Sequence, residues 1–217
     1  MTTFTHSDTT TPTTTIPRRR TLVLLAVGFV LVFGSLLLGS SETDPDSSLE
    51  TIRSAYDGSH LLVQVTGYAS MAACAVLVFL GAGVRSALRS RRPSWTADVA
   101  MLGFVVIALT IASWVVSGLA LWHAVDQGED ASVRTLNFVD TSNFLPLMTG
   151  MVCAYVGAGA AGLVSGTLPR WLAVASIVVG LLAPLGLLGF VPAMLLPIWL
   201  VVVSALVRVG EPEPDRS

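Results

Sequence analysis

The chain has 217 residues, of which 53% are apolar and only 12% are charged. About a quarter of the residues in a typical soluble domain are charged, so this composition excludes an ordinary soluble domain and predicts a polytopic membrane protein. The net charge of -2 excludes no class of partner, because acids and bases occupy different segments of the chain. All 12 basic side chains are arginine, a usage that is typical of GC-rich coding sequences and favours a bacterial source.

Residues 1–20 form a threonine-rich tail that ends in the arginine triplet 18–20. The tail has almost nothing apolar to bury, so we expect it to be disordered and cytoplasmic. The apolar run 21–38 follows it, and this layout is also that of a secretory signal peptide. The run is longer than the apolar region of such a peptide, and residues 38–41 (LGSS) make a poor cleavage site. We therefore expect an uncleaved first span.

The arginine-rich segment 85–92 determines the expected orientation of the whole chain. It carries four arginines and lies between two membrane-length apolar runs, the second span at 59–84 and the third span at 97–122. A short basic loop of this kind stays on the cytoplasmic side in most membrane proteins. The acid-rich segment before the second span, residues 41–58, is therefore expected outside.

The fourth span is expected over residues 143–165, after a second acid-rich outer segment at 123–142. Its glycines and alanines recur three or four residues apart, and small residues at this spacing let helix backbones approach closely in lipid. We therefore expect this helix to lie at the centre of the bundle. The same small-residue face is a candidate contact for a second copy of the chain or for another membrane protein.

The last apolar stretch, residues 171–209, is too long for one span. A single helix of this length would measure about 60 Å at ~1.5 Å per residue, twice the hydrocarbon thickness of ~30 Å. Glycine and proline are the strongest breakers of a helix, so the turn is expected at 186–192, where two glycines and a proline fall. A fifth span then covers 171–188 and a sixth covers 191–208.

These elements predict an all-α, polytopic membrane helical bundle with six transmembrane helices over residues 21–209 and with both termini in the cytoplasm. The tail at 210–217 is short and acidic. Ten of the 12 arginines fall in segments that this topology places inside. They are Arg18, Arg19, Arg20, Arg85, Arg89, Arg91, Arg92, Arg170, Arg208 and Arg216. A re-entrant hairpin in the last stretch is the alternative, and it would put the C-terminus outside.

The candidate functional residues gather at the expected outer ends of the spans, because no acid or base lies in the middle of any span. Ionisable groups deep in a membrane mark proton-coupled transport, so this pattern argues against such a mechanism. His60, His123 and Asp140 lie at the outer ends of three different spans. Two histidines and a carboxylate on neighbouring helices are able to bind a divalent metal or to act as a general base.

The simpler interpretation of these three residues is structural. Asp140 lies where a helix N-cap is expected, and no spacing motif ties it to His60 or His123. Asn137, Asp140 and Asn143 recur at intervals of three, so they share one face if their helix begins early. We expect no metal, no cofactor and no nucleic acid partner, because the sequence has no zinc-ligand, phosphate-loop or nucleophile motif.

We also have expectations about how two serines, one tryptophan and two prolines within the spans pack. Ser113 and Ser117 in the third span are expected to bond the preceding helical turn or to reach a neighbouring helix. Trp114 lies between them and is expected to pack against a neighbouring helix. Pro184 and Pro197 are expected to kink the fifth and sixth spans.

Two short segments carry a resemblance to known proteins. Residues 136–147 (LNFVDTSNFLPL) precede a glycine-rich helix, and residues 168–172 (LPRWL) open the next span. Together they resemble a family of uncharacterised bacterial six-span integral membrane proteins, defined as a domain of unknown function. The resemblance implies the same six-span layout over about residues 20–209, and it implies no activity or site.

The sequence therefore predicts a multi-pass protein of the bacterial cytoplasmic membrane, with the lipid bilayer as its main partner. The expected function is that of a non-catalytic structural or accessory component. A small-solute transporter or permease subunit is the first alternative. A membrane enzyme that uses His60, His123 and Asp140 is the second.

Overall fold

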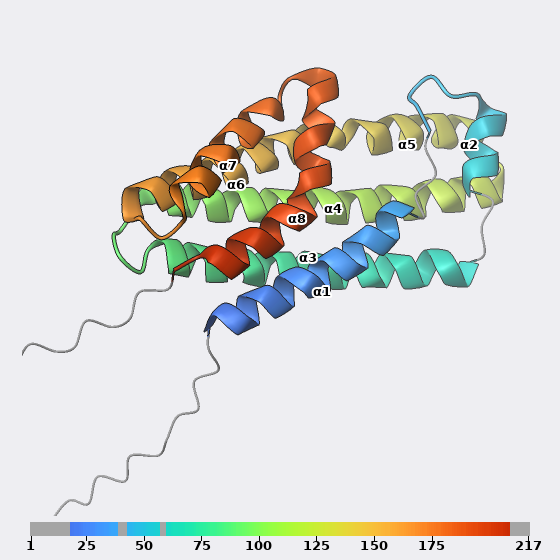
Figure 1. Cartoon of the computed structure of the whole chain (residues 1–217). Helices are drawn as coiled ribbons and strands as arrows, with labels where there is room; N and C mark the ends of the chain where they lie inside the picture. The colour runs from blue at the N-terminus through green and yellow to red at the C-terminus, as the bar shows by residue number, and fades with distance from the viewer. Residues whose placement is uncertain (1–17, 39–42, 57–59, 209–217) are drawn as a thin grey trace, which may run out of the picture.

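The described part of the chain is built from α-helices (Figure 1). It comprises residues 18–38, 43–56 and 60–208 of a computed structural model. Within these ranges the only other helical element is one short 3-10 turn, and no strand occurs, so the prediction of an all-α fold is confirmed. Most of the threonine-rich tail and all of the acidic C-terminal tail lie outside the described residues.

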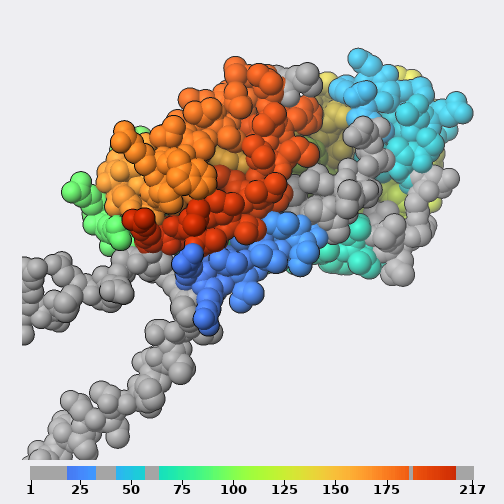
Figure 2. Space-filling view, in the orientation of Figure 1, coloured from blue at the N-terminus to red at the C-terminus, as the bar shows by residue number. Residues whose placement is uncertain are grey.

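The helices follow one another closely along the chain. They are α1 (Arg18–Leu38), α2 (Leu49–Tyr56), α3 (His60–Leu88), α4 (Trp95–Gln127), α5 (Asp130–Ser142), α6 (Phe144–Ser165), α7 (Arg170–Leu182) and α8 (Phe190–Leu206), with the 3-10 turn η1 (Gly186–Gly189) before α8. In Figure 1, α3, α4 and the α5–α6 pair run side by side along one long axis. α1, α7 and α8 cover one side of these long helices, and Figure 2 shows α1 and α8 lying against each other.

Three helical stretches of the described chain are long and apolar enough to cross a membrane: Gln64–Leu88, Trp95–Gln127 and Asp130–Ser165. α7 and α8 are shorter apolar helices. Along α4, Leu102, Leu109 and Val116 expose 59% or more of their surface at intervals of seven residues. A continuous exposed apolar stripe of this kind marks a surface that contacts lipid or another protein.

The segment 123–142, expected as an outer loop, is helical. α4 continues to Gln127 and ends at Gly128, whose φ of 73° is the left-handed conformation that glycine adopts at helix C-termini. α5 then begins at Asp130. Charged side chains do not end a helix that faces water. The acidic residues after the third span therefore do not stop α4, and the helix continues until this glycine.

A second, smaller hydrophobic core holds the acidic end of the molecule together. Ile52 of α2, Leu121 and Ala124 of α4, and Val133 of α5 are buried against one another. We call α2, α5 and the last two turns of α4 the cap. The segment 49–56, expected as part of a loop, is thus a short helix that lies across the ends of α4 and α5 (Figure 1).

The main core depends on close contact between α4 and α6. A Cβ atom placed on Gly103 of α4 would lie 2.7 Å from the Gly150 carbonyl oxygen and 2.8 Å from Ala154 Cα. One placed on Gly157 of α6 would lie 2.6 Å from the Ala100 amide nitrogen. The two backbones therefore touch, as expected for small residues in lipid. α6 lies between α4 and α7, so its predicted central position is confirmed.

The last apolar stretch folds back at the predicted turn. α7 ends at Leu182, so Pro184 follows the fifth helix rather than kinking it, whereas Pro197 does lie inside α8. The rings of Phe144, at the start of α6, and Phe190, at the start of α8, stack with centroids 4.6 Å apart. The tip of the α7–α8 hairpin is therefore level with the start of α6.

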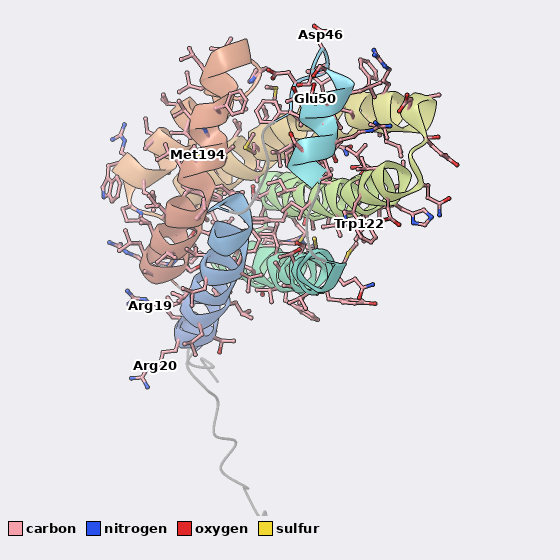
Figure 3. All side chains as sticks on the ribbon, turned by 90° about the vertical axis from the view of Figure 1, so that its right-hand side faces the viewer. Arg19, Arg20, Asp46, Glu50, Trp122 and Met194 are labelled. Atoms are coloured by element: carbon pink, nitrogen blue, oxygen red, sulfur yellow. The ribbon has the colours of Figure 1, made fainter. Side chains whose placement is uncertain are left out.

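The arginine-bearing segments meet at the end of the bundle opposite the cap. The Arg91 guanidinium lies 3.4 Å from the Gly166 carbonyl oxygen, and the Arg208 amide nitrogen donates to the Thr167 carbonyl oxygen at 2.8 Å. The side chain of Leu22, in the first turns of α1, occupies the space beside Gly83 near the end of α3. We call this end of the bundle the arginine end. Viewed from the cap side, Asp46 and Glu50 lie on α2 and its approach, far from Arg19 and Arg20 (Figure 3).

Candidate functional site

A cluster of polar side chains joins α4 to the junction of α5 and α6. The Asp140 carboxylate accepts a hydrogen bond from the Ser117 hydroxyl, and the Tyr56 side chain bonds the same carboxyl group. The Trp114 indole N–H donates to the Asp140 backbone carbonyl at 2.7 Å. This carbonyl, at the C-terminal end of α5, also accepts the backbone N–H of Asn143 at 3.2 Å. The predicted packing of Trp114 against a neighbouring helix is confirmed.

Asn143, the single residue between α5 and α6, extends this cluster. Its side-chain nitrogen lies 3.4 Å from the Ser117 hydroxyl, and its side-chain oxygen accepts from the Ser113 hydroxyl at 3.1 Å. Ser117 also donates to the Trp114 carbonyl at 3.1 Å. Both expected roles of the two serines are therefore present, a bond within the helix and a bond to a neighbour.

Asn137 is fully buried and ties the cap to the segment that precedes α2. Its side-chain oxygen accepts from the Thr43 hydroxyl and its side-chain nitrogen donates to the Asp44 carbonyl, each at 2.8 Å. α5 begins seven residues before Asn137, at Asp130. Asn137, Asp140 and Asn143 thus all turn toward neighbouring segments, as their spacing predicted for a helix that begins early.

The two candidate histidines are not part of this described network. His60 opens α3, but its side chain lies outside the described residues. His123 is exposed, and its Nε2 lies 3.3 Å from the Gln127 side-chain nitrogen. Among the residues that the structure describes, no group of three or more His, Cys, Asp or Glu side chains is placed to hold a metal ion. In the described part of the chain, Asp140 bonds Ser117 and Tyr56 and so links α5 to α4 and to α2.

A second polar site closes the arginine end. Asp98, in the first turn of α4, accepts from Arg85 Nε at 2.5 Å and from Arg89 Nη1 at 2.8 and 3.0 Å. The positive end of the helix dipole also favours an acid in this first turn of α4. The two ion pairs connect Arg85, in the last turn of α3, and Arg89, just after that helix, to the first turn of α4 across the short loop between them.

A buried aromatic cluster, which the sequence did not predict, connects α6, α7 and α8. The Tyr155 hydroxyl donates to the Pro192 carbonyl at 2.9 Å, and the Trp199 indole N–H donates to the Ser176 hydroxyl at 2.8 Å. The Tyr155 and Trp199 rings lie 4.3 Å apart. Phe104 of α4 stacks on Trp199 at 6.1 Å. Each buried polar atom named here has a partner, so the cluster contributes to packing as well as to hydrogen bonding.

No protein-family model, curated protein or solved structure matches this chain. The resemblance of residues 136–147 and 168–172 to a bacterial six-span family stays an expectation.

Proposed function

We propose that this chain is a six-span integral protein of the bacterial cytoplasmic membrane and acts as a structural or accessory component without catalysis of its own. The observation that carries the accessory role is the backbone contact between α4 and α6, where Gly103 and Gly157 leave no room for a side chain. Backbones packed this closely form a stiff unit, because neither helix can shift without opening voids. The α4–α6 pair is therefore a stiff axis, which suits a protein that holds one of its surfaces in a defined place outside the membrane.

The cap is the surface that this axis would hold. α4 has 33 residues, about 50 Å at ~1.5 Å per residue, whereas the hydrocarbon layer is ~30 Å thick. α6 has 22 residues, about 33 Å by the same measure, and so matches that layer. The end of α4 that extends past the start of α6 therefore projects from the membrane together with α2 and α5.

Two contacts support six spans over a re-entrant hairpin. The Phe144–Phe190 stack places the tip of the α7–α8 hairpin level with the cap-side start of α6. The hydrogen bond between the Arg208 amide and the Thr167 carbonyl returns α8 to the turn from which α7 starts. α7 and its turn thus lead away from the arginine end and α8 leads back to it, which is the course that two crossings require.

The distribution of charge supports a cytoplasmic arginine end. Arg19, Arg20, the arginine-rich segment 85–92, Arg170 and Arg208 belong to segments that meet at this end. The cap and the segments that adjoin it carry every described acid except Asp98. Positively charged segments next to spans remain inside, so both chain termini would lie in the cytoplasm.

Ligand-dependent thermal unfolding of the purified protein in detergent tests the proposed role. An accessory component is expected to keep its melting temperature across a panel of metabolites and divalent cations. A saturable rise with one metabolite would contradict the proposal in favour of a transporter. A rise with a divalent cation that Asp140→Asn abolishes would instead favour a membrane enzyme.

A photo-crosslinking residue in place of Phe138 supplies the positive test. Phe138 lies on α5 and exposes 61% of its surface, so a component that presents the cap is expected to crosslink there to one protein in stoichiometric amounts in living cells. The matched control is the same substitution at Leu109, which is exposed at 65% on the lipid-facing stripe of α4. Equal crosslinking at both positions, or at neither, would argue against a cap that binds a partner.

A further inference from the structure

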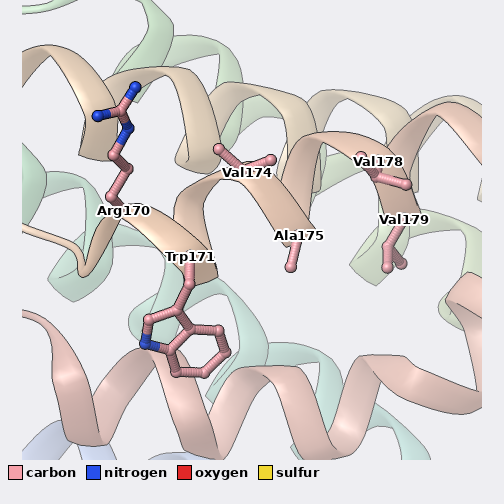
Figure 4. Close-up of a pocket in the computed structure, with 6 residues that line it drawn as sticks. All are labelled: Arg170, Trp171, Val174, Ala175, Val178 and Val179. Atoms are coloured by element: carbon pink, nitrogen blue, oxygen red, sulfur yellow. The ribbon is translucent and has the colours of Figure 1, made fainter.

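The arginine end carries guanidinium groups that have no acidic partner in the described part of the chain. Four of them are exposed and form none of the ion pairs among the described residues: Arg91, Arg92, Arg170 and Arg208. Asp98, the described acid at this end, is already shared by two other arginines. The Arg170 side chain also points away from the neighbouring Trp171 ring (Figure 4). This end of the bundle therefore presents positive charge that the described residues do not neutralise.

The turn between α6 and α7 places two of these arginines beside the end of α8. Its Gly166 carbonyl oxygen lies 3.4 Å from the Arg91 guanidinium. Its Thr167 carbonyl oxygen accepts a hydrogen bond from the Arg208 amide at 2.8 Å. Arg170 opens α7 directly after this turn. The chain that continues beyond Arg208 therefore starts close to Arg91 and Arg170.

That continuation is acidic. Residues 209–217 (VGEPEPDRS) carry one arginine and three acids, which are Glu211, Glu213 and Asp215. The described acids other than Asp98 all lie at the opposite end of the bundle, in the cap or next to it. We propose that residues 209–217, the acidic tail, dock on the arginine end and neutralise the guanidinium groups of Arg91 and Arg170.

The length and the composition of the acidic tail suit these contacts. An extended chain spans ~3.3 Å per residue, so Glu211 and Glu213 reach up to about 10 and 17 Å from Arg208. Each glutamate precedes a proline, which favours an extended backbone and reduces the entropy that docking costs. One exposed ion pair contributes little. Several pairs on one short tether act together, because the tether keeps the acids at a high local concentration.

A docked tail makes the arginine end a covered surface. A soluble polyanion then binds there only when the tail is displaced, and its apparent affinity falls with the fraction of time for which the surface is free. This inference goes beyond the proposed accessory role, because it concerns the end of the bundle opposite the cap and holds whether or not the cap binds a partner.

Zero-length crosslinking tests the contact, because the chain contains no lysine. Arg170→Lys and, separately, Arg91→Lys each introduce the only side-chain amine, which a water-soluble carbodiimide joins to a carboxylate in contact with it. In the purified protein in detergent, each variant is expected to form an intramolecular crosslink to an acid of the tail, identified by mass spectrometry of its peptides. The crosslink is expected to be lost in about 1 M NaCl, where the Debye length is ~3 Å. Arg134→Lys, at an exposed position of the cap, is the matched control and is expected to crosslink to acids of the cap alone.

Binding of inositol hexakisphosphate, measured by calorimetry in detergent, tests whether the tail covers the arginine end. The tail variant combines Glu211→Gln, Glu213→Gln and Asp215→Asn. It is expected to bind this polyanion at least about threefold more tightly than the wild type, as for a surface that is free no more than about one third of the time. The control variant combines Asp46→Asn, Glu50→Gln and Asp126→Asn, three exposed acids in the cap or next to it. It changes the net charge equally and is expected to bind as the wild type does.

Three crosslinking results would overturn the proposal. They are the absence of a tail crosslink from both lysine variants, a tail crosslink that survives 1 M NaCl, and crosslinks only to the tail of a second copy, seen as a covalent dimer. Equal binding of inositol hexakisphosphate by the tail variant and the control variant would overturn it as well. A transporter or enzyme result in the thermal assay would leave these outcomes unchanged.

Discussion

Gly103→Ala tests whether α4 and α6 are in backbone contact. The added methyl group would lie 2.7 Å from the Gly150 carbonyl oxygen and closer still to the Ala154 amide nitrogen. Both obstacles are backbone atoms of α6, so the clash is relieved only if the helices move apart. Overpacking of this kind costs ~1–3 kcal/mol, and the upper part of that range applies because no flexible side chain can yield. Alanine recovers ~0.5–1 kcal/mol of helix stability over glycine, which leaves a net loss of about 2 kcal/mol.

Gly118→Ala on the same helix is the matched control. A Cβ atom at Gly118 would meet nothing within 4 Å, so only the gain in helix stability remains. The free energy of unfolding is measured by titrating sodium dodecyl sulfate into mild-detergent micelles and following tryptophan fluorescence. The two variants are expected to differ by about 3 kcal/mol, the sum of the loss and the gain. Equal stability of Gly103→Ala and Gly118→Ala would refute the backbone contact.

The same titration checks two further side chains. Tyr155→Phe removes the buried hydroxyl that donates to the Pro192 carbonyl at 2.9 Å. This variant is expected to lower the free energy of unfolding by about 1 kcal/mol. An unchanged free energy of unfolding would mean that this hydrogen bond is absent in solution. Asp98→Asn weakens the ion pairs with Arg85 and Arg89, whose side chains are 37–43% exposed. Exposed pairs contribute little to the free energy of unfolding and weaken with salt, so a large loss of stability that salt does not reduce would contradict this exposure.

Hydropathy was sufficient to locate the apolar helices. α6 begins at Phe144 and ends at Ser165, within one residue of the span expected from the sequence, and α1 ends at Leu38 as expected. The turn near Gly186 was also predictable, because the stretch from 171 to 209 exceeds the thickness of a bilayer and contains few other breakers. Length and composition therefore determine where the apolar helices lie along the chain.

The cap was not predictable from the same signals. Composition marks 123–142 and 41–58 as polar and acidic, which is typical of loops and also of helices that face water. The burial of Ile52 and Val133 depends on a contact between segments about eighty residues apart in the chain. Asn137, Asp140 and Asn143 recur at intervals of three residues. This spacing was the one sign in the sequence that a helix begins before the fourth span.

The polar cluster shows a second limit of sequence reasoning. Asp140 was a candidate because it lies at the outer end of a span, and the structure does place it among polar side chains. Its partners Ser117 and Tyr56 depend on the rotation of α4 about its axis and on the position of α2, neither of which hydropathy determines. His123 lies near the cap-side end of the same helix as Ser117 and bonds Gln127 instead.

Cysteine accessibility on intact cells tests the proposed topology most directly. The background protein carries Cys74→Ala and Cys153→Ala, and one new cysteine is added to it at a time. The two positions are Ser132→Cys in the cap and Ser90→Cys in the arginine-rich segment 85–92. Cells without an outer-membrane barrier are then treated with a membrane-impermeant maleimide. Ser132→Cys is expected to label at once, and Ser90→Cys only after the membrane is permeabilised. Labelling of Ser90→Cys on intact cells, or protection of Ser132→Cys, would contradict a cytoplasmic arginine end and a cap outside the membrane.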